Sequence, residues 1–149
     1  MIKKVLVFLL CLLSFGCIAK TNNTKDNNVI TYFKYSYCGG EGILYTYEIQ
    51  KTENKILFTK SLFIGKEYKY EKEINKNILD NIKTIISDYE VFKWNGFDKS
   101  DDRIMDRDDF NLNVTHEDGT IIKANGYMKY PDGYDYSSKF LIDYLESIN

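Results

Sequence analysis

Apolar and polar residues alternate along much of the chain, and this two-residue period constrains the fold more than any other feature of the sequence. Four strand-like runs occupy the first half, over residues 29–37, 43–50, 55–62 and 66–73. An extended backbone places every second side chain on the same side, so this period is that of a half-buried β-strand. Thirteen Tyr and nine Phe residues with a single Pro also favour strands. We therefore expect consecutive strands joined by short turns.

The fourth run carries many charges. Lys and Glu residues alternate with Tyr68 and Tyr70 between residues 66 and 73. Because charged side chains along a strand hinder edge-to-edge aggregation, we place this strand at an edge of the sheet.

A helical period follows this strand. Apolar residues three or four apart mark one face of an amphipathic helix, namely Ile74, Ile78, Ile82, Ile85 or Ile86, and Tyr89. Asn75 is the expected N-cap of a helix that ends near Tyr89. A second, short amphipathic helix is predicted at the C-terminus from Phe140, Leu141, Tyr144, Leu145 and Ile148.

Residues 110–126 predict a β-hairpin with a specific register. Apolar residues alternate on both sides of a turn at residues 117–119. A two-residue loop would place Val114 opposite Lys123, whereas a three-residue loop places it opposite Ile122. The second register keeps the apolar side chains on one face, so we expect a three-residue loop that ends in glycine.

This order of elements predicts the fold class. Strands, a helix, a hairpin and a second helix indicate an α+β domain: an antiparallel sheet of about six strands with two helices packed on one face. Residues 29–149 are long enough for one domain with its own core.

The N-terminal residues have the pattern of an export signal. Lys3 and Lys4 form a positive region, and the apolar run that follows is shorter than the roughly 20 residues needed to span a bilayer. Residues 13–17, Leu-Ser-Phe-Gly-Cys, resemble the lipobox of bacterial lipoproteins, although the bulky Phe departs from its usual form. The resemblance implies cleavage before Cys17 and acylation of its thiol. An ordinary secretory peptide cleaved near Ala19 would instead discard Cys17.

The lipobox divides the chain into three parts. Residues 1–16 are the expected signal peptide, residues 17–28 are the lipidated cysteine and a flexible polar tether, and residues 29–149 are the domain. More than one acyl chain anchors a protein stably. We therefore expect an exported chain held to a membrane of the cell envelope.

Charge excludes one class of partner. Without the signal peptide, 18 basic residues face 22 acidic ones, a net charge of −4. A mildly acidic chain without a basic face is not expected to bind nucleic acid.

Residues for nucleophilic catalysis are few. Cys38 is the one cysteine beyond the signal and the lipidation site, and His116 is the one histidine. Hydrolases of the serine or cysteine type need a histidine base. His116 flanks the predicted hairpin turn, and Cys38 lies next to a glycine-rich turn, so we expect structural roles for both.

Residues 98–109 form an acidic loop with six candidate ligands for Ca²⁺: Asp98, Asp101, Asp102, Asp106, Asp108 and Asp109. The loop departs from an EF-hand, because Arg103 stands where the turn needs Gly and Asp109 stands where a bidentate Glu belongs. The alternative is a solvated loop with local ion pairs.

A set of aromatic residues is the second candidate site, as a ligand or partner surface: Trp94, Tyr127, Tyr130, Tyr134 and Tyr136. The alternative is that these rings pack at the edge of the core.

The C-terminal third resembles a pattern found in uncharacterised bacterial proteins. Residues 94–101, 108–110, 117–120 and 126–131 carry the resemblance, which implies no activity but suggests a shared loop arrangement around Trp94, Gly96, Gly126 and Pro131. Two hypotheses follow. The first is a non-enzymatic envelope lipoprotein that binds an envelope protein or glycan. The second is a hydrolase of envelope polymers that uses acidic residues of the 98–109 loop, with or without a divalent metal.

Overall fold

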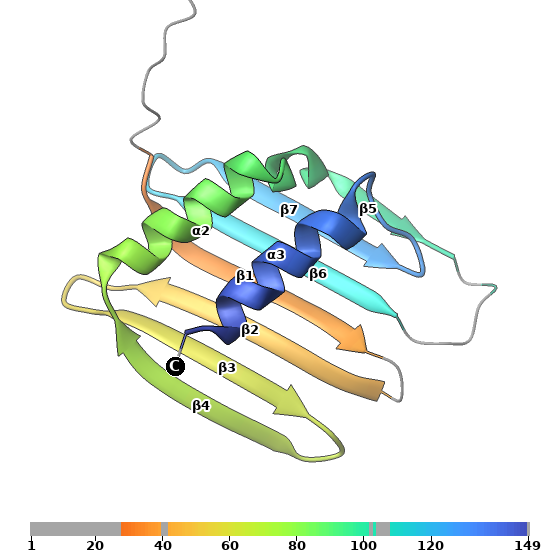
Figure 1. Cartoon of the computed structure of the whole chain (residues 1–149), viewed down its shortest axis with the longest axis horizontal. Helices are drawn as coiled ribbons and strands as arrows, with labels where there is room; N and C mark the ends of the chain where they lie inside the picture. Colours follow the sequence, from red (N-terminus) through yellow and green to blue (C-terminus); the bar gives the residue numbers. More distant parts are fainter. Residues whose placement is uncertain (1–27, 40–41, 102, 104–107, 149) are drawn as a thin grey trace, which may run out of the picture.

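A computed structural model describes residues 28–39, 42–101, 103 and 108–148. The expected signal peptide, Cys17 and all of the tether except Asn28 lie outside these residues. The described chain folds into a mixed α/β structure built on a seven-stranded sheet (Figure 1). The strands are β1 (Ile30–Gly39), β2 (Ile43–Lys51), β3 (Ile56–Phe63), β4 (Glu67–Ile74), β5 (Phe97–Ser100), β6 (Asp109–His116) and β7 (Ile121–Tyr127). The helices are α2 (Lys76–Asp88), the 3₁₀ turn η2 (Val91–Trp94) and α3 (Tyr134–Glu146).

Strand β1 lies at the centre of the sheet, whose order is β4-β3-β2-β1-β6-β7-β5. It pairs antiparallel with β2 on one side and with β6 on the other. The first four strands form a meander, so β4 is an edge strand, as its charge pattern predicts. The second half of the chain joins the sheet through β6.

The expectation of about six antiparallel strands is close but needs correction. The sheet has a seventh strand, β5, which pairs parallel to β7 with Phe97 opposite Ala124. Four residues are too few to show an alternation in the sequence, and a 3₁₀ turn and Gly96 with φ of +80° lead directly into this strand.

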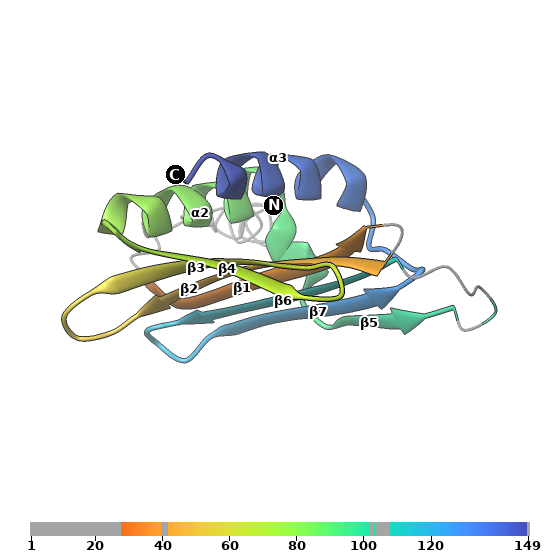
Figure 2. The same cartoon turned by 90° about the horizontal axis from the view of Figure 1, so that it is seen from below.

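The two faces of the sheet differ sharply. Buried apolar side chains of the six strands β1, β2, β3, β4, β6 and β7 form one cluster with those of the helices, and Phe33, Tyr35, Tyr47 and Leu112 are almost fully buried in it. Figure 2 shows α2 and α3 above this face of the sheet. Side chains at the alternate positions point to the opposite face, which the helices leave open.

The two helices begin differently, with a polar side-chain cap at α2 and with Gly133 in the left-handed region before α3. The Asn75 side chain accepts a hydrogen bond from the Asn77 N–H at 2.9 Å, which confirms the predicted N-cap of α2. Helix α3 begins at Tyr134, six residues before the apolar pattern that predicted it. Its first turns bury Ser137 and Ser138 rather than large apolar residues, and the Ser137 hydroxyl donates to the Tyr89 carbonyl at 2.7 Å.

The C-terminal hairpin has the predicted register. Val114 lies opposite Ile122, and Leu112 lies opposite Ala124. The Gly119 N–H donates to the His116 carbonyl at 3.0 Å, and Gly119 has φ of +85°. The three-residue loop is therefore confirmed, because it alone keeps the apolar set on the covered face.

An aromatic cluster joins this hairpin to α3. The Phe110 ring centroid lies 4.5 Å from that of Tyr134 and 5.9 Å from those of Trp94 and Tyr130. Gly126 lies opposite Phe110 across the strands, and a Cβ built on it would overlap the Phe110 ring and the Lys129 carbonyl oxygen. The absence of a side chain at residue 126 is what lets Phe110 sit against the strand.

Replacing Gly126 with alanine should therefore destabilise the domain. The added methyl group has no space, and overpacking of this kind typically lowers the free energy of unfolding by about 1–3 kcal/mol. The measurement is urea unfolding followed by circular dichroism. The control is Lys123→Ala on the open face of the same strand, which should change the free energy by no more than about 0.5 kcal/mol. Equal stability of Gly126→Ala and wild type would contradict the close packing.

Candidate functional site

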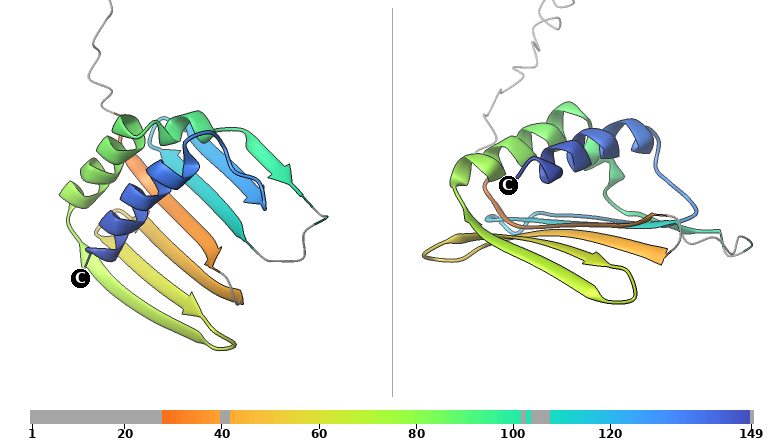
Figure 3. Two further views of the ribbon diagram at one scale, coloured as in Figure 1. Left: turned by 45° about the vertical axis from the view of Figure 1, so that its right-hand side comes forward. Right: turned by 60° about the horizontal axis from the view of Figure 1, so that its bottom comes forward.

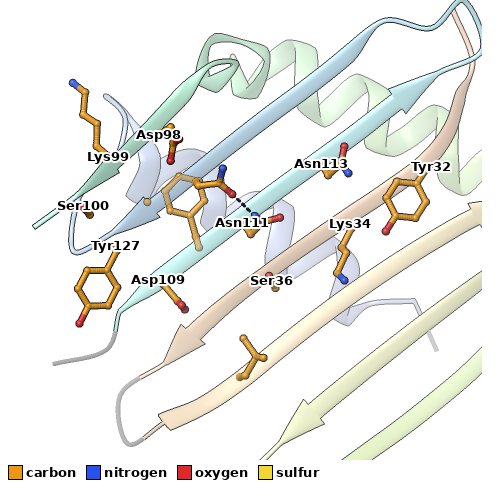
Figure 4. Close-up of a pocket in the computed structure, with 14 residues that line it drawn as sticks. Tyr32, Lys34, Ser36, Asp98, Lys99, Ser100, Asp109, Asn111, Asn113 and Tyr127 are labelled. Atoms are coloured by element: carbon orange, nitrogen blue, oxygen red, sulfur yellow. Dashed lines mark hydrogen bonds between the residues drawn. The ribbon is translucent and has the colours of Figure 1, made fainter. Parts of the chain in front are cut away.

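A depression of about 880 Å³ opens on the uncovered face of the sheet, where β1, β6, β7 and β5 lie side by side (Figure 4). Its volume is within the usual range of small-ligand sites. The side chains that matter for its chemistry are Tyr32, Lys34, Ser36, Asp98, Asp109, Asn111, Asn113, Asn125 and Tyr127.

Three asparagines from neighbouring strands form the floor of this depression. Asn111 pairs with Ser36 on β1 and with Asn125 on β7, and Asn125 pairs with Asp98 on β5. One row of the sheet thus presents a hydroxyl, two amides and a carboxylate over four strands, roughly 14 Å at the usual strand spacing. The Asn111 amide nitrogen donates to Asn125 Oδ1, which leaves each amide with further hydrogen-bonding capacity.

Asn113 has an unusual environment in the next row. It lies between Lys34 on β1 and Lys123 on β7. Its Oδ1 atom is buried and has no hydrogen-bond partner among the described residues. A buried acceptor without a donor destabilises a fold by about 1–3 kcal/mol, and such groups are few in native proteins. Because this oxygen is shielded from solvent, a donor outside the described residues reaches it only when the Asn113 side chain turns toward the depression.

Tyrosines flank the amides. Tyr32 and Tyr127 are both half-buried and stand at different ends of the depression (Figure 4). Burial and, after it, the nearby charge of Glu48 raise the pKa of Tyr32. Its hydroxyl therefore stays protonated at neutral pH and remains a hydrogen-bond donor.

The acidic loop does not gather into one centre. Asp98 and Asp109 line the depression, whereas the exposed Asp108 does not, and Asp102 and Asp106 lie outside the described residues. Within the described part of the chain, no group of three or more His, Cys, Asp or Glu residues is arranged to hold a metal ion.

Asp101 is instead held by two cations. Arg103 donates to it through Nε and Nη2, each at 2.9 Å, and the Lys129 ammonium lies 3.3 Å from its Oδ2. The side chain is 8% exposed. Asp101 thus ties the loop after β5 to the segment after β7, and its charge is already neutralised.

The five candidate aromatic residues do not share one surface. Trp94 is almost fully buried, and the Tyr134 hydroxyl makes a 2.8 Å hydrogen bond with that of Tyr35 inside the molecule. Tyr130 stacks on Tyr134, Tyr136 is 64% exposed on α3, and Tyr127 lies in the depression. Four of them therefore belong to the core or to its helix side, and one belongs to the candidate site.

Cys38 and His116 are too far apart to act together. His116 lies opposite Ile30 at the start of β1, and Cys38 lies near the end of the same strand. Eight residues of strand separate these positions by about 26 Å. His116 is buried, with Nδ1 at 3.3 Å from the Thr120 carbonyl oxygen.

The amide floor was not predicted from the sequence, although the alternation of residues 110–126 implies outward positions for Asn111 and Asn113. The signal was present, because Asn111, Asn113 and Asn125 occupy outward positions of one hairpin. Ser36 and Lys34 could not be added from the sequence, since the pairing of β1 with β6 joins positions about 75 residues apart.

Comparison with known proteins adds no family. No family model matches the chain, and no curated protein matches it either. Among the described helices, none has the length and apolar character needed to cross a membrane.

Asp101→Asn should lower the stability of the domain in a pH-dependent way. Hydrogen bonds from Arg103 and then Lys129 hold the pKa of Asp101 well below its ordinary value of about 3.8. A carboxylate of this kind stabilises the fold above its unfolded pKa, and the stabilisation is lost as pH falls through the folded pKa. The difference in unfolding free energy between wild type and variant should be complete above about pH 5 and shrink below about pH 4.

Chemical unfolding at several pH values measures this difference. Glu53→Gln, in the exposed turn between β2 and β3, is the matched control and should show little change at any pH. A constant difference from pH 3 to pH 7 would show that Asp101 acts through something other than its charge.

Proposed function

We propose that this protein is a membrane-tethered, non-enzymatic binding module of the cell envelope, and that its open sheet face binds a neutral glycan. The observation that carries the proposal is the row of amide and hydroxyl groups on four adjacent strands, next to the unpartnered Asn113 oxygen. The lipobox-like residues that end at Cys17 support the tether.

The chemistry of the depression suits sugar hydroxyl groups. A hydroxyl both donates and accepts, and so does the side-chain amide of asparagine, so neighbouring amides can bind vicinal hydroxyls in pairs. Tyr32 and Tyr127 add amphipathic rings against which the apolar side of a sugar ring can pack. The floor lacks the apolar lining that a hydrophobic ligand needs.

Charge supports the same choice. Lys34 and Lys99 line the depression together with Asp98 on β5 and Asp109 on β6. A nucleic acid would need a basic stripe, which this mixture does not provide. A neutral ligand avoids burying an unpaired charge against either sign.

Titration calorimetry with envelope oligosaccharides tests the binding site. Asn111→Ala should weaken binding about fivefold, since one hydrogen bond contributes about 1 kcal/mol net. Asn113→Ala should weaken binding to a similar degree but leave the unfolding free energy unchanged or higher, because it removes a buried acceptor that has no partner. Thr59→Ala, on β3 of the same face but outside the depression, is the control.

Two results would count against this site. Loss of binding in the Thr59→Ala control as well would show that the effect is not local. Binding of extended peptides in place of glycans would change the ligand class.

The hydrolase hypothesis keeps one specific observation, that Asp98 and Asp109 line the same depression. They lie on strands separated by β7 and about two residues apart along the sheet, which places their Cα atoms roughly 12 Å apart. Retaining and inverting glycosidases bring two carboxyl groups within about 5–9.5 Å. Release of shorter oligosaccharides by wild type, abolished in Asp98→Asn and Asp109→Asn, would favour the enzyme.

Acylation of Cys17 is the testable basis of the tether. Cells fed an alkyne-labelled fatty acid should incorporate it into the wild-type chain and into Cys38→Ser, but not into Cys17→Ser. The labelled chains should float with membranes, because two or more acyl chains give stable anchoring. Equal labelling of Cys17→Ser and wild type would contradict acylation at this residue.

A further inference from the structure

Exposed apolar side chains that do not pack into the core lie at and beside the turn between β3 and β4. We define the hairpin tip by its large exposed residues, Leu44, Phe63, Ile64 and Tyr68, which are 38%, 46%, 53% and 57% exposed. Leu44 lies opposite Phe63 across β2 and β3, and Tyr68 lies opposite Leu62 across β3 and β4. The four residues therefore lie at one corner of the sheet.

Packing into the helix-covered core does not account for these exposed side chains. Leu44 and Phe63 point to the open face, which elsewhere carries polar residues such as Thr46 and Ser61. Tyr68 points to the other face, but the tip projects past the area that α2 and α3 cover (Figure 3). The tip is thus apolar on both faces and at its turn, which marks a contact with a partner or a membrane.

Tyr68 and Lys66 give the apolar tip side chains that suit a bilayer surface. The Lys66 ammonium lies 5.8 Å from the centre of the Tyr68 ring, whereas Lys69 is paired with Glu71 at 2.8 Å and Glu67 lies opposite Phe63. Tyr and Lys side chains place an apolar body in the membrane interface while their polar ends stay in water. Each lysine near an anionic bilayer adds about 1 kcal/mol of attraction.

The reach of the N-terminal segment is compatible with this contact. Strand β1 starts at the end of the sheet opposite the tip, and the eight residues of β3 span about 26 Å between the two ends. Eleven residues separate Cys17 from Val29, and a chain of that length extends to at most about 36–40 Å. An anchor at Cys17 thus allows the tip to touch the same membrane.

We propose that the hairpin tip docks into the interface of the membrane that tethers the chain, with Phe63 and Ile64 among the headgroups. The occupant of this surface is an anionic lipid bilayer. The inference rests on the proposed tether for its geometry, and it adds a second, independent contact with the membrane.

Fluorescence of the acylated full chain in vesicles tests the contact. In a Cys38→Ala background, an environment-sensitive dye is attached at Ile64→Cys or, as the control, at Glu53→Cys in the turn at the opposite end of the strands. Vesicles of phosphatidylcholine, with or without phosphatidylglycerol, carry a nitroxide lipid as quencher. We expect several-fold stronger quenching at residue 64 than at residue 53, and more with phosphatidylglycerol. Adding Phe63→Ser should reduce the quenching at residue 64.

The outcomes separate the two proposals. A chain that floats with vesicles but shows equal, weak quenching at residues 64 and 53 overturns the docking and leaves the tether intact. A chain that does not float with vesicles overturns the tether. A blue shift at residue 64 that depends on protein concentration and not on lipid overturns the docking in favour of self-association.

Discussion

The pairing of β1 with β6 is the contact on which the rest of the structure depends. It joins the N-terminal meander to the C-terminal hairpin and aligns residues such as Tyr35 and Leu112, which are far apart in the chain. Helix α2 follows the first half and α3 follows the second, so this pairing brings both helices onto one sheet. This register also decides which side chains become neighbours on the open face, since Ser36 and Lys34 meet Asn111 and Asn113 only through it.

Covering one face with two helices constrains the other face. A sheet buried on one side needs polar side chains on the other to stay in water, so an array of Asn, Ser, Thr and Lys residues is the expected solvent face. Two local departures from this expectation carry information. The Asn113 oxygen is buried without a partner, and Leu44 and Phe63 are apolar where polar residues would serve. Neither feature is needed for the core, which is why we relate them to binding.

Local chemistry determined what could be predicted from the sequence. The Asn75 cap, the edge position of β4 and the Val114–Ile122 register follow from side-chain period, capping and turn length, and the structure confirms them. Strand β5 was missed because its parallel pairing with β7 is a tertiary contact over four residues. The start of α3 was missed because small buried serines replace large apolar residues there. Asp101 was grouped with metal ligands, although its neighbours in space are Arg103 and Lys129.

The two proposed contacts use largely different parts of the sheet and share Leu44, which belongs to the hairpin tip and also lines the depression. The hairpin tip lies at the β4 side of the sheet, whereas the amide floor lies over β1, β6, β7 and β5. Docking through the tip would hold the strands at an angle to the bilayer, and the row of Ser36 and Asn111 lies two residues along the strands from the row of Leu44 and Phe63. A glycan next to the membrane could then cross the strands along the row from Ser36 to Asp98. A tether alone would leave the domain free to rotate, and a second contact reduces the orientational entropy lost when a fixed polymer binds.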